Sequence, residues 1–214
     1  MADHLNTIKE AVVAGKHGEI AALVRRAIDD GTAPDRIINE ALIPAMDSIG
    51  REFALGNVFV PEMLVSAVTM KNGLAVVKPL LTAEQSESRG TIIMSTVKGD
   101  LHDIGKNLVT IMLEGAGFKV FDLGVDLSVE KLIEQVKQIK PQILGLSALL
   151  TTTMPEMKKV IEELEAQGIR KSIKVMVGGA PLDHAFAQKI GADGYGANAA
   201  EAVGLARRFV GTGS

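Results

Sequence analysis

Hydrophobic side chains recur every three to four positions through the first part of the chain, a spacing typical of amphipathic helices. The pattern predicts helices at about 8–13, 20–28, 34–53 and 61–77, separated by short turns that contain glycine. Pro44 falls inside the third helix and is expected to kink it, because proline lacks an N–H and its ring crowds the preceding turn. Amphipathic helices joined by short turns predict a four-helix bundle.

From Thr91 the pattern changes to short apolar runs that alternate with amphipathic segments. The runs predict strands at 91–97, 118–123, 142–147, 173–177 and 193–195, and the segments between and after them predict helices at 104–115, 129–139, 154–167, 183–190 and 199–210. Strands that are apolar on both faces, each followed by a helix, predict a parallel, doubly wound α/β sheet. Right-handed crossovers favour the strand order 2-1-3-4-5.

The segment that separates the two patterns is polar and rich in small residues, which is typical of a linker. We therefore expect a helical cap domain at 1–82, a linker at 83–90 and an α/β domain at 91–214.

Composition narrows the classes of function. The chain has 214 residues, 47% of them hydrophobic, and a formal net charge of −3 without a basic patch, which argues against nucleic acid as a partner. The absence of cysteine excludes disulfides, thiolate metal sites and a cysteine nucleophile. No secretory signal is evident, and no apolar run approaches the ~18 residues of a membrane helix, so we expect a cytoplasmic protein with no membrane partner.

The most informative polar residues follow the first predicted strand, at the edge of the sheet where parallel α/β proteins bind ligands. Asp100 precedes His102 by two positions, so its carboxylate can hydrogen-bond one ring nitrogen and leave the other free for a metal. Gly105 has no side chain and lets a bulky group approach the backbone. Taken alone, the same letters also fit a helix cap at Asp100 and an ordinary polar histidine.

Two further motifs close the next central strands: Ser147 with Leu149, and the pair Gly178–Gly179. The ordered set Asp-x-His-x-x-Gly, Ser-x-Leu and Gly-Gly resembles the cobalamin-binding signature of methionine synthase and of the corrinoid methyl-carrier proteins. The resemblance covers nearly the whole chain and implies a helical cap followed by a Rossmann-like (flavodoxin-like) five-stranded domain.

The resemblance implies that His102 binds the cobalt of a corrinoid, whose nucleotide tail is displaced and buried beside the sheet. Asp100 would orient His102, and Ser147 would extend the hydrogen-bond chain. Gly178 and Gly179, with Gly105, would keep the tail channel open, although each also fits an ordinary turn. The remaining residues that we place at the cofactor are Gly99, Leu101, Asp103, Leu149, Thr151 and Ala199.

Two of the expected contacts have structural alternatives. The turn 56–62 resembles the entry to the last cap helix of methionine synthase, whose apolar side chains cover the upper face of the corrin. Phe59 is therefore the first candidate for this cover, with Val60 and Met63 next, but Phe59 could instead staple the turn to the bundle. Thr151 could lie at the corrin edge or cap the following helix. The other histidines, His4, His17 and His184, have no matching motif partners, and we expect them to be surface residues.

As a function, the resemblance implies a stand-alone corrinoid protein that uses cobalamin, as methylcobalamin or a related corrinoid. It would be a carrier rather than a complete enzyme, because no substrate pocket of its own is evident. Its expected partners are a substrate-specific methyltransferase, a second methyltransferase with tetrahydrofolate or coenzyme M as acceptor, and a reductive activase.

Three alternatives share part of the pattern. A subunit of a B12-dependent mutase has the histidine motif, but the helical cap argues against it. A cobalamin-sensing regulator would need a DNA-binding domain, for which the chain has no room. A phosphoacceptor receiver domain has the same strand order, but it needs an aspartate at the end of the third strand, where this chain has Ser147.

Overall fold

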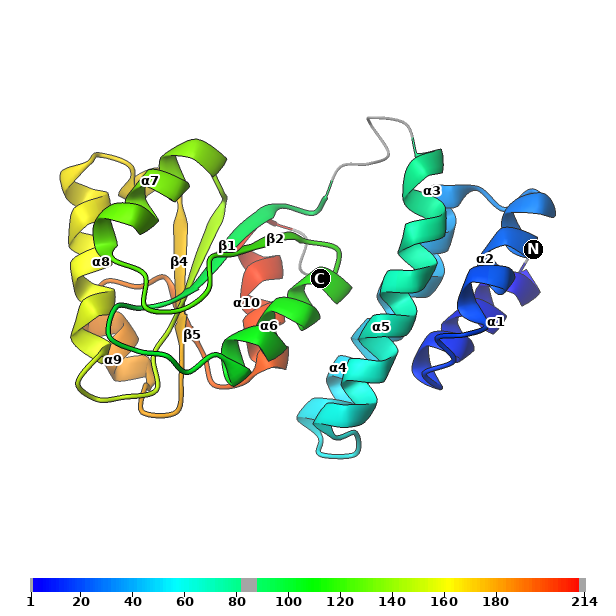
Figure 1. Cartoon of the computed structure of the whole chain (residues 1–214), viewed down its shortest axis with the longest axis horizontal. Helices are drawn as coiled ribbons and strands as arrows, with labels where there is room; N and C mark the ends of the chain where they lie inside the picture. The colour runs from blue at the N-terminus through cyan, green and yellow to red at the C-terminus, as the bar shows by residue number, and fades with distance from the viewer. Residues whose placement is uncertain (1, 82–87, 212–214) are drawn as a thin grey trace. The chain divides into compact units, whose positions relative to one another are not determined.

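The computed structural model describes residues 2–81 and 88–211 and is shown in Figure 1. The described chain forms two compact units, the first helical and the second built around a parallel sheet. The expected linker at 83–90 falls largely outside the described residues, so the domain boundaries stay predictions.

The helical unit confirms the predicted bundle. Its elements are α1 (Ala2–Val13), α2 (Ile20–Asp29), α3 (Pro34–Arg36), η1 (Ile37–Leu42), α4 (Ile43–Ala54), α5 (Val60–Val77) and η2 (Lys78–Leu80). The predicted periodic positions form its core, since Ile8, Ile20, Ile37 and Leu42 are fully buried. The bundle therefore rests on the apolar stripes that the helical period places on one face of each helix.

The disturbance predicted at Pro44 takes a defined form. The turn before it, η1, is a π-helix in which the N–H of Ile43 donates to the carbonyl of Ile38, five residues back. Pro44 then lies in the first turn of α4, where its missing N–H costs little. The wider π-turn lets the chain pass through the proline without ending the helical run from 34 to 54.

Helix α5 and the turn after it form an apolar stretch despite three charged residues. Glu62, Lys71 and Lys78 interrupt every apolar run, but the continuous helical stretch Val60–Leu80 is long and apolar enough, by length and composition alone, to cross a membrane. The expectation that no apolar segment is long enough for a membrane helix is therefore wrong for Val60–Leu80 when its length and mean composition are considered. Its inner residues, such as Met63 and Met70, are buried in the bundle, which is the ordinary reason for such a helix in a globular domain.

The second unit contains a five-stranded parallel sheet with the predicted order β2-β1-β3-β4-β5. Its strands are β1 (Thr91–Thr96), β2 (Lys119–Asp122), β3 (Ile143–Ser147), β4 (Lys174–Gly178) and β5 (Gly194–Gly196). The helices after them are α6 (Ile104–Gly115), α7 (Val129–Ile139), α8 (Met154–Ala166), α9 (His184–Lys189) and α10 (Ala199–Phe209), with a short turn, η3 (Arg170–Ser172), before β4.

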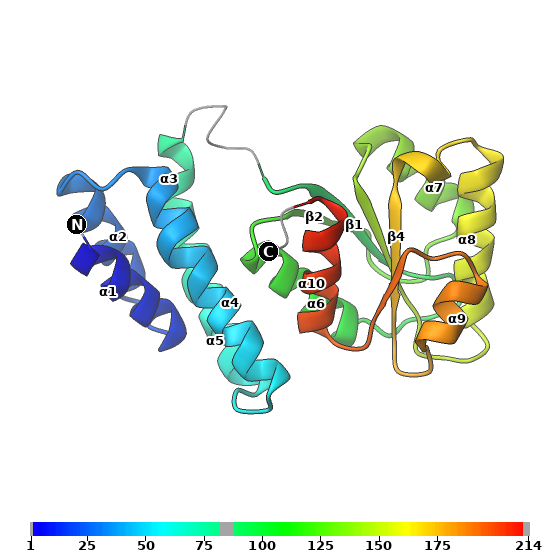
Figure 2. The ribbon, with the colours of Figure 1, turned by 180° about the vertical axis from the view of Figure 1, so that it is seen from behind.

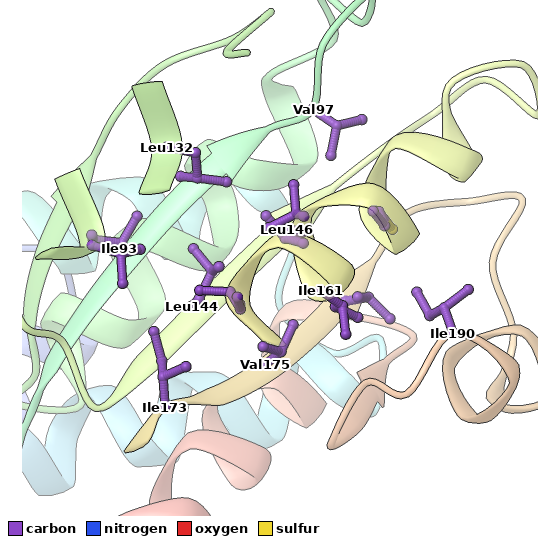
Figure 3. Packing of buried hydrophobic residues seen from close by; sticks show 14 of the residues in the cluster. Ile93, Val97, Leu132, Leu144, Leu146, Ile161, Ile173, Val175 and Ile190 are labelled. Carbon is purple, nitrogen blue, oxygen red and sulfur yellow. The ribbon is translucent and has the colours of Figure 1, made fainter. Parts of the chain in front are cut away.

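Helices cover both faces of this sheet, as the two views of the unit show (Figures 1 and 2). Helices α7, α8 and α9 lie on one face, and α6 and α10 lie on the other. Branched side chains fill the space under the first group, among them Leu144, Leu146 and Val175 from the strands and Ile161 from α8 (Figure 3). Because both faces are covered, the ligand-binding surface is left to the loops at the carboxyl edge of the strands.

Candidate functional site

The loop between β1 and α6 places a buried carboxylate beneath an exposed imidazole. Asp100 is 0% exposed, whereas 51% of the side-chain surface of His102 is accessible. Oδ1 of Asp100 lies 2.7 Å from Nδ1 of His102 and also accepts the His102 backbone N–H at 3.0 Å. Nδ1 is thereby engaged with the protein, and Nε2 is the ring nitrogen left for a ligand.

The other oxygen of Asp100 is held by the loop after β3. Oδ2 accepts the backbone N–H groups of Leu149 and Leu150, at 2.8 and 3.2 Å, and the hydroxyl of Thr153 at 2.8 Å. Burial by itself would raise the pKa of Asp100, but the N–H groups of Leu149 and His102, the imidazole and the Thr153 hydroxyl together hold that pKa well below its usual range. Asp100 is therefore an ionised, fixed hydrogen-bond acceptor for His102.

This network corrects the expected role of Ser147. The hydroxyl that extends the Asp100–His102 pair belongs to Thr153, six positions further on, in the residue that immediately precedes α8. Ser147 is instead the last residue of β3, where its carbonyl accepts the N–H of Val97. Thr151 lies exposed between them, and the residue at the cap position of α8 is Thr153, so the cap interpretation of Thr151 is wrong.

The three glycines of the motif differ in their surroundings. A Cβ built on Gly105 would meet no atom within 4 Å, so space is open at the start of α6. A Cβ on Gly179, where φ is +139°, would come within 1.8 Å of the Ala148 carbonyl oxygen, and one on Gly178 would lie 3.2 Å from the Gly196 oxygen. Space is therefore open at Gly105, whereas protein backbone lies close to Gly178 and Gly179, and the tail channel itself stays a prediction.

Exposed apolar side chains flank His102 in the sequence and follow β3, in the loop whose backbone binds Asp100. Leu101 and Ile104, on either side of His102, are 71% and 83% exposed, and Leu149 and Leu150 are also exposed. Exposed leucine and isoleucine in two adjoining loops are unusual for a surface that only water covers, and they fit a flat apolar ligand above His102.

Three predicted residues also make contacts within the fold, and Gly99 and Asp103 remain exposed. Gly99 donates its N–H to the carboxylate of Asp126, and the carboxylate of Asp103 accepts the side-chain amide of Asn107 in the first turns of α6. Ala199 begins α10 and is buried, so it offers almost no surface to a ligand.

In the helical unit, exposure separates the three candidates for an apolar cover. Phe59 is 68% exposed, which excludes the interpretation of this side chain as a buried staple. The backbone N–H of Phe59 donates to the carboxylate of Glu62. This bond fixes the main chain of Phe59 at the start of α5, while its side chain stays exposed. Val60 is exposed as well, whereas Met63 is completely buried and cannot serve as a cover.

The remaining histidines make contacts of their own, and Nδ1 of His17 lies 3.2 Å from the carbonyl oxygen of Gly15. Nε2 of His4 lies 2.9 Å from a carboxylate oxygen of Asp30, and the ring of His184 meets the edge of Tyr195 with centroids 5.1 Å apart. None of them shares the arrangement of His102, in which a fully buried carboxylate holds one ring nitrogen of a half-exposed imidazole.

The donor set fits a corrinoid better than a bare metal ion. In the part of the chain that the structure describes, no group of three His, Cys, Asp or Glu side chains could hold a metal ion. A corrin ring would supply most of the ligands of its own cobalt, so a single imidazole from the protein would be sufficient. His102, the open space at Gly105 and the exposed leucine and isoleucine side chains meet that requirement.

Comparison with known families points to the same cofactor. Two B12 binding domain families match the chain, one over residues 90–204, the sheet unit, and the other over residues 4–78, the helical unit.

Individual relatives resemble the chain over almost its whole length. The dimethylamine corrinoid protein of Methanosarcina barkeri is 41% identical over 207 residues, which cover 96% of this chain and 97% of the relative. A cobalamin-binding protein from Desulfitobacterium hafniense has a solved structure with a TM-score of 0.81 and 34% identity, covering 96% of this chain and 98% of the relative. A chain in the methanol:cobalamin methyltransferase complex MtaBC of Methanosarcina barkeri gives a TM-score of 0.88 at 32% identity, covering 98% of this chain and 80% of that one.

Proposed function

The chain belongs to the B12-binding corrinoid proteins of methyltransferase systems, and we propose that His102 is the residue by which it holds the cobalt of its cofactor. The observation that carries this proposal is the geometry of one pair: Asp100 engages Nδ1 of His102 at 2.7 Å, while 51% of the side-chain surface of His102 remains accessible. When bound, the corrinoid supplies the methyl-transfer chemistry, because its cobalt takes up and releases the methyl group.

The protein's own contribution is to orient and tune the imidazole. The buried Asp100 carboxylate fixes the ring orientation. It also makes Nε2 a better electron-pair donor to a metal, because a hydrogen-bonded carboxylate raises the basicity of the ring. Thr153 and the backbone N–H groups of Leu149 and Leu150 keep this carboxylate ionised and immobile. We propose that Leu101, Leu149 and Thr151 contact the corrin from the sheet side and that Phe59 covers it as an apolar lid.

The ligand assignment is tested by spectroscopy of the protein reconstituted with cobalamin. We expect one corrinoid per chain and, in the Co(II) form, the electron paramagnetic resonance splitting of a nitrogen ligand. His102→Ala should remove this splitting, whereas His184→Ala, which changes another histidine of the same unit, should retain it. An unchanged spectrum in His102→Ala would contradict the assignment.

We also propose the partners of this carrier. One is a substrate-specific methyltransferase that loads the cofactor, the second is a methyltransferase that passes the group to tetrahydrofolate or coenzyme M, and the third is a reductive activase. The relatives support the first of these, since one of the matching structures is a chain in a complex named as a methanol:cobalamin methyltransferase.

The loading partner defines the methyl donor. A tagged copy of the chain, expressed in cells grown on methylamines, methanol, betaine or a methoxylated aromatic in turn, should retain a methyltransferase whose identity follows the growth substrate. His102→Ala serves as a control for folding and surface, because it changes the ligand and leaves the rest of the chain intact. Recovery of a mutase barrel instead of a methyltransferase would overturn the carrier function.

A further inference from the structure

The loop that carries His102 is attached to a second loop, the one that follows β2. The N–H of Thr96 donates to the carbonyl of Gly124, the N–H of Leu127 donates to the carbonyl of Thr96, and Val97 pairs with Leu127 as an isolated parallel bridge. The two loops therefore continue the pairing of β1 with β2 beyond the end of the sheet.

Within the loop that follows β2, Asp126 bonds to the residues three and two positions before His102. Its carboxylate accepts the N–H of Gly99 at 2.7 Å, and its own N–H donates to the carbonyl of Asp100 at 3.1 Å. These bonds engage the backbone on both sides of the peptide that joins Gly99 to Asp100. Asp126 adopts a φ of +55°, a left-handed conformation that aspartate tolerates better than most residues, and this turn brings its N–H and its carboxylate to the same loop.

The loop after β2 is itself fixed at its origin. Asp122, the last residue of β2, accepts the N–H of Gly124 and forms an ion pair with the buried Nζ of Lys106. Lys106 lies in the first turn of α6, four positions after His102. The chain segment that contains His102 is thus held at both ends by the end of β2 and the loop after it, at Gly99–Asp100 through Asp126 and at Lys106 through Asp122.

We propose that Asp126 is a positioning residue for the cobalt ligand: by holding the backbone at Gly99 and Asp100 it keeps the Asp100–His102 pair in the geometry that binds cobalt. This inference rests on the proposed function of His102. Loss of the Asp126 carboxylate would free the loop, lower the share of molecules with a correctly placed imidazole and so weaken the cobalt–histidine bond.

The test measures how readily an added ligand replaces His102. In the protein reconstituted with cyanocobalamin, a second cyanide binds cobalt in place of the lower ligand, and the absorption spectrum reports the conversion. In Asp126→Gly, which lacks the carboxylate but permits the left-handed backbone, the half-converting cyanide concentration should fall by about threefold or more, as expected for one lost hydrogen bond. Asp126→Asn, which keeps an acceptor oxygen and tolerates the same conformation, should stay close to the wild-type value.

A matched control distinguishes positioning from general destabilisation. Asp193 also accepts a backbone N–H, that of Val175 at 2.8 Å, but it precedes β5 at the opposite edge of the sheet. Asp193→Ala should lower the melting temperature and leave the cyanide titration unchanged. The positioning role is wrong if Asp126→Gly titrates like the wild type, or if Asp193→Ala shifts the midpoint equally.

His102→Ala identifies the source of a negative result. If this variant titrates like the wild type, His102 is not the ligand, and the proposed site and the role of Asp126 fail together. If His102→Ala differs from the wild type and Asp126→Gly does not, only the role of Asp126 fails.

Discussion

At the scale of single residues, the site depends on a carboxylate that water does not reach. Asp100 uses both oxygens, one toward His102 and the other toward Leu149, Leu150 and Thr153. A buried carboxylate without such donors would be costly and would take up a proton, and a protonated carboxyl is a poorer acceptor for an imidazole N–H. The donors from the loop after β3 therefore act on the histidine through Asp100, to which their hydrogen bonds go.

Thr153 provides a direct test of this dependence. Thr153→Ala removes a hydroxyl donor from a buried charge and should lower the free energy of unfolding by about 1–3 kcal/mol, measured by denaturant titration. Thr153→Ser retains the donor and should recover most of this loss. Equal stability of the alanine and serine variants would show that the hydroxyl contributes nothing to Asp100.

Phe59 belongs to the same scale, because its exposure makes its role separable from folding. Since the side chain is 68% exposed, Phe59→Ala should change the free energy of unfolding by less than about 1 kcal/mol. In protein loaded with methylcobalamin, the loss of an apolar cover should speed photolysis, followed by absorbance under constant illumination. Leu55→Ala, which removes a similarly exposed apolar side chain nearby in the sequence, should photolyse like the wild type. An unchanged photolysis rate in Phe59→Ala would show that Phe59 is not a lid.

At the scale of elements, charged groups link β4 to the residue just before β5, the outer strand of the sheet on the side away from β2. The carboxylate of Asp193, just before β5, accepts the Val175 N–H at 2.8 Å and pairs with Arg170 and Lys174 at 2.8 and 3.1 Å. Burial by itself would raise the pKa of Asp193, but the Val175 N–H, Lys174 and Arg170 outweigh it and lower that pKa. This network anchors the short edge strand, which forms few ladder bonds of its own.

The lowered pKa of Asp193 predicts a pH dependence of stability. Because the folded state prefers the ionised carboxylate, the contribution is complete above the unfolded pKa of about 3.9 and is lost as the pH falls through the lower folded value. Asp193→Asn should therefore be less stable than the wild type at neutral pH, with the gap narrowing below about pH 4. Thermal melts across this range measure the gap. Glu165→Gln, on the exposed face of α8, should show no such convergence, and a gap independent of pH would refute the assignment.

At the scale of the whole molecule, the two units contain different parts of the proposed site. The sheet unit contains His102 with its complete hydrogen-bond network, and the helical unit contains the exposed Phe59. Each unit buries its own apolar core, Ile20 and Leu42 in the bundle and Leu144 and Val175 in the sheet unit. We therefore expect the sheet unit to bind cobalamin alone and the helical unit to add protection.

Limited proteolysis tests this organisation. The polar, small-residue segment between Thr82 and Gly90 should be cut before either unit, because protease needs an exposed and adaptable backbone. The carboxyl-terminal fragment, once isolated, should bind cobalamin with a nitrogen ligand that disappears in His102→Ala. Early cuts within residues 91–200, or a fragment that binds no cobalamin, would contradict the proposed boundaries.

The amino-acid sequence by itself determined the elements and the family. A period near 3.6 in the first part of the chain and near-continuous apolar runs in the second are local properties, so they predicted the bundle, the five strands and their order. The motif around Asp100 and His102 was equally local, because two residues at this spacing in one loop meet whatever the remaining chain does.

Only the tertiary structure decided which distant groups complete the site. Thr153 rather than Ser147 donates to Asp100, from 53 positions away in the sequence, and Asp126 accepts the N–H of Gly99, from 27 positions away. The loops bring these distant residues together. Gly179 owes its identity to the carbonyl of Ala148 across the sheet edge, a contact that hydrophobic periodicity does not encode. Periodicity records which face of an element is buried, whereas hydrogen-bond partners depend on the path of the chain between elements, and that path exists only once the whole domain has packed.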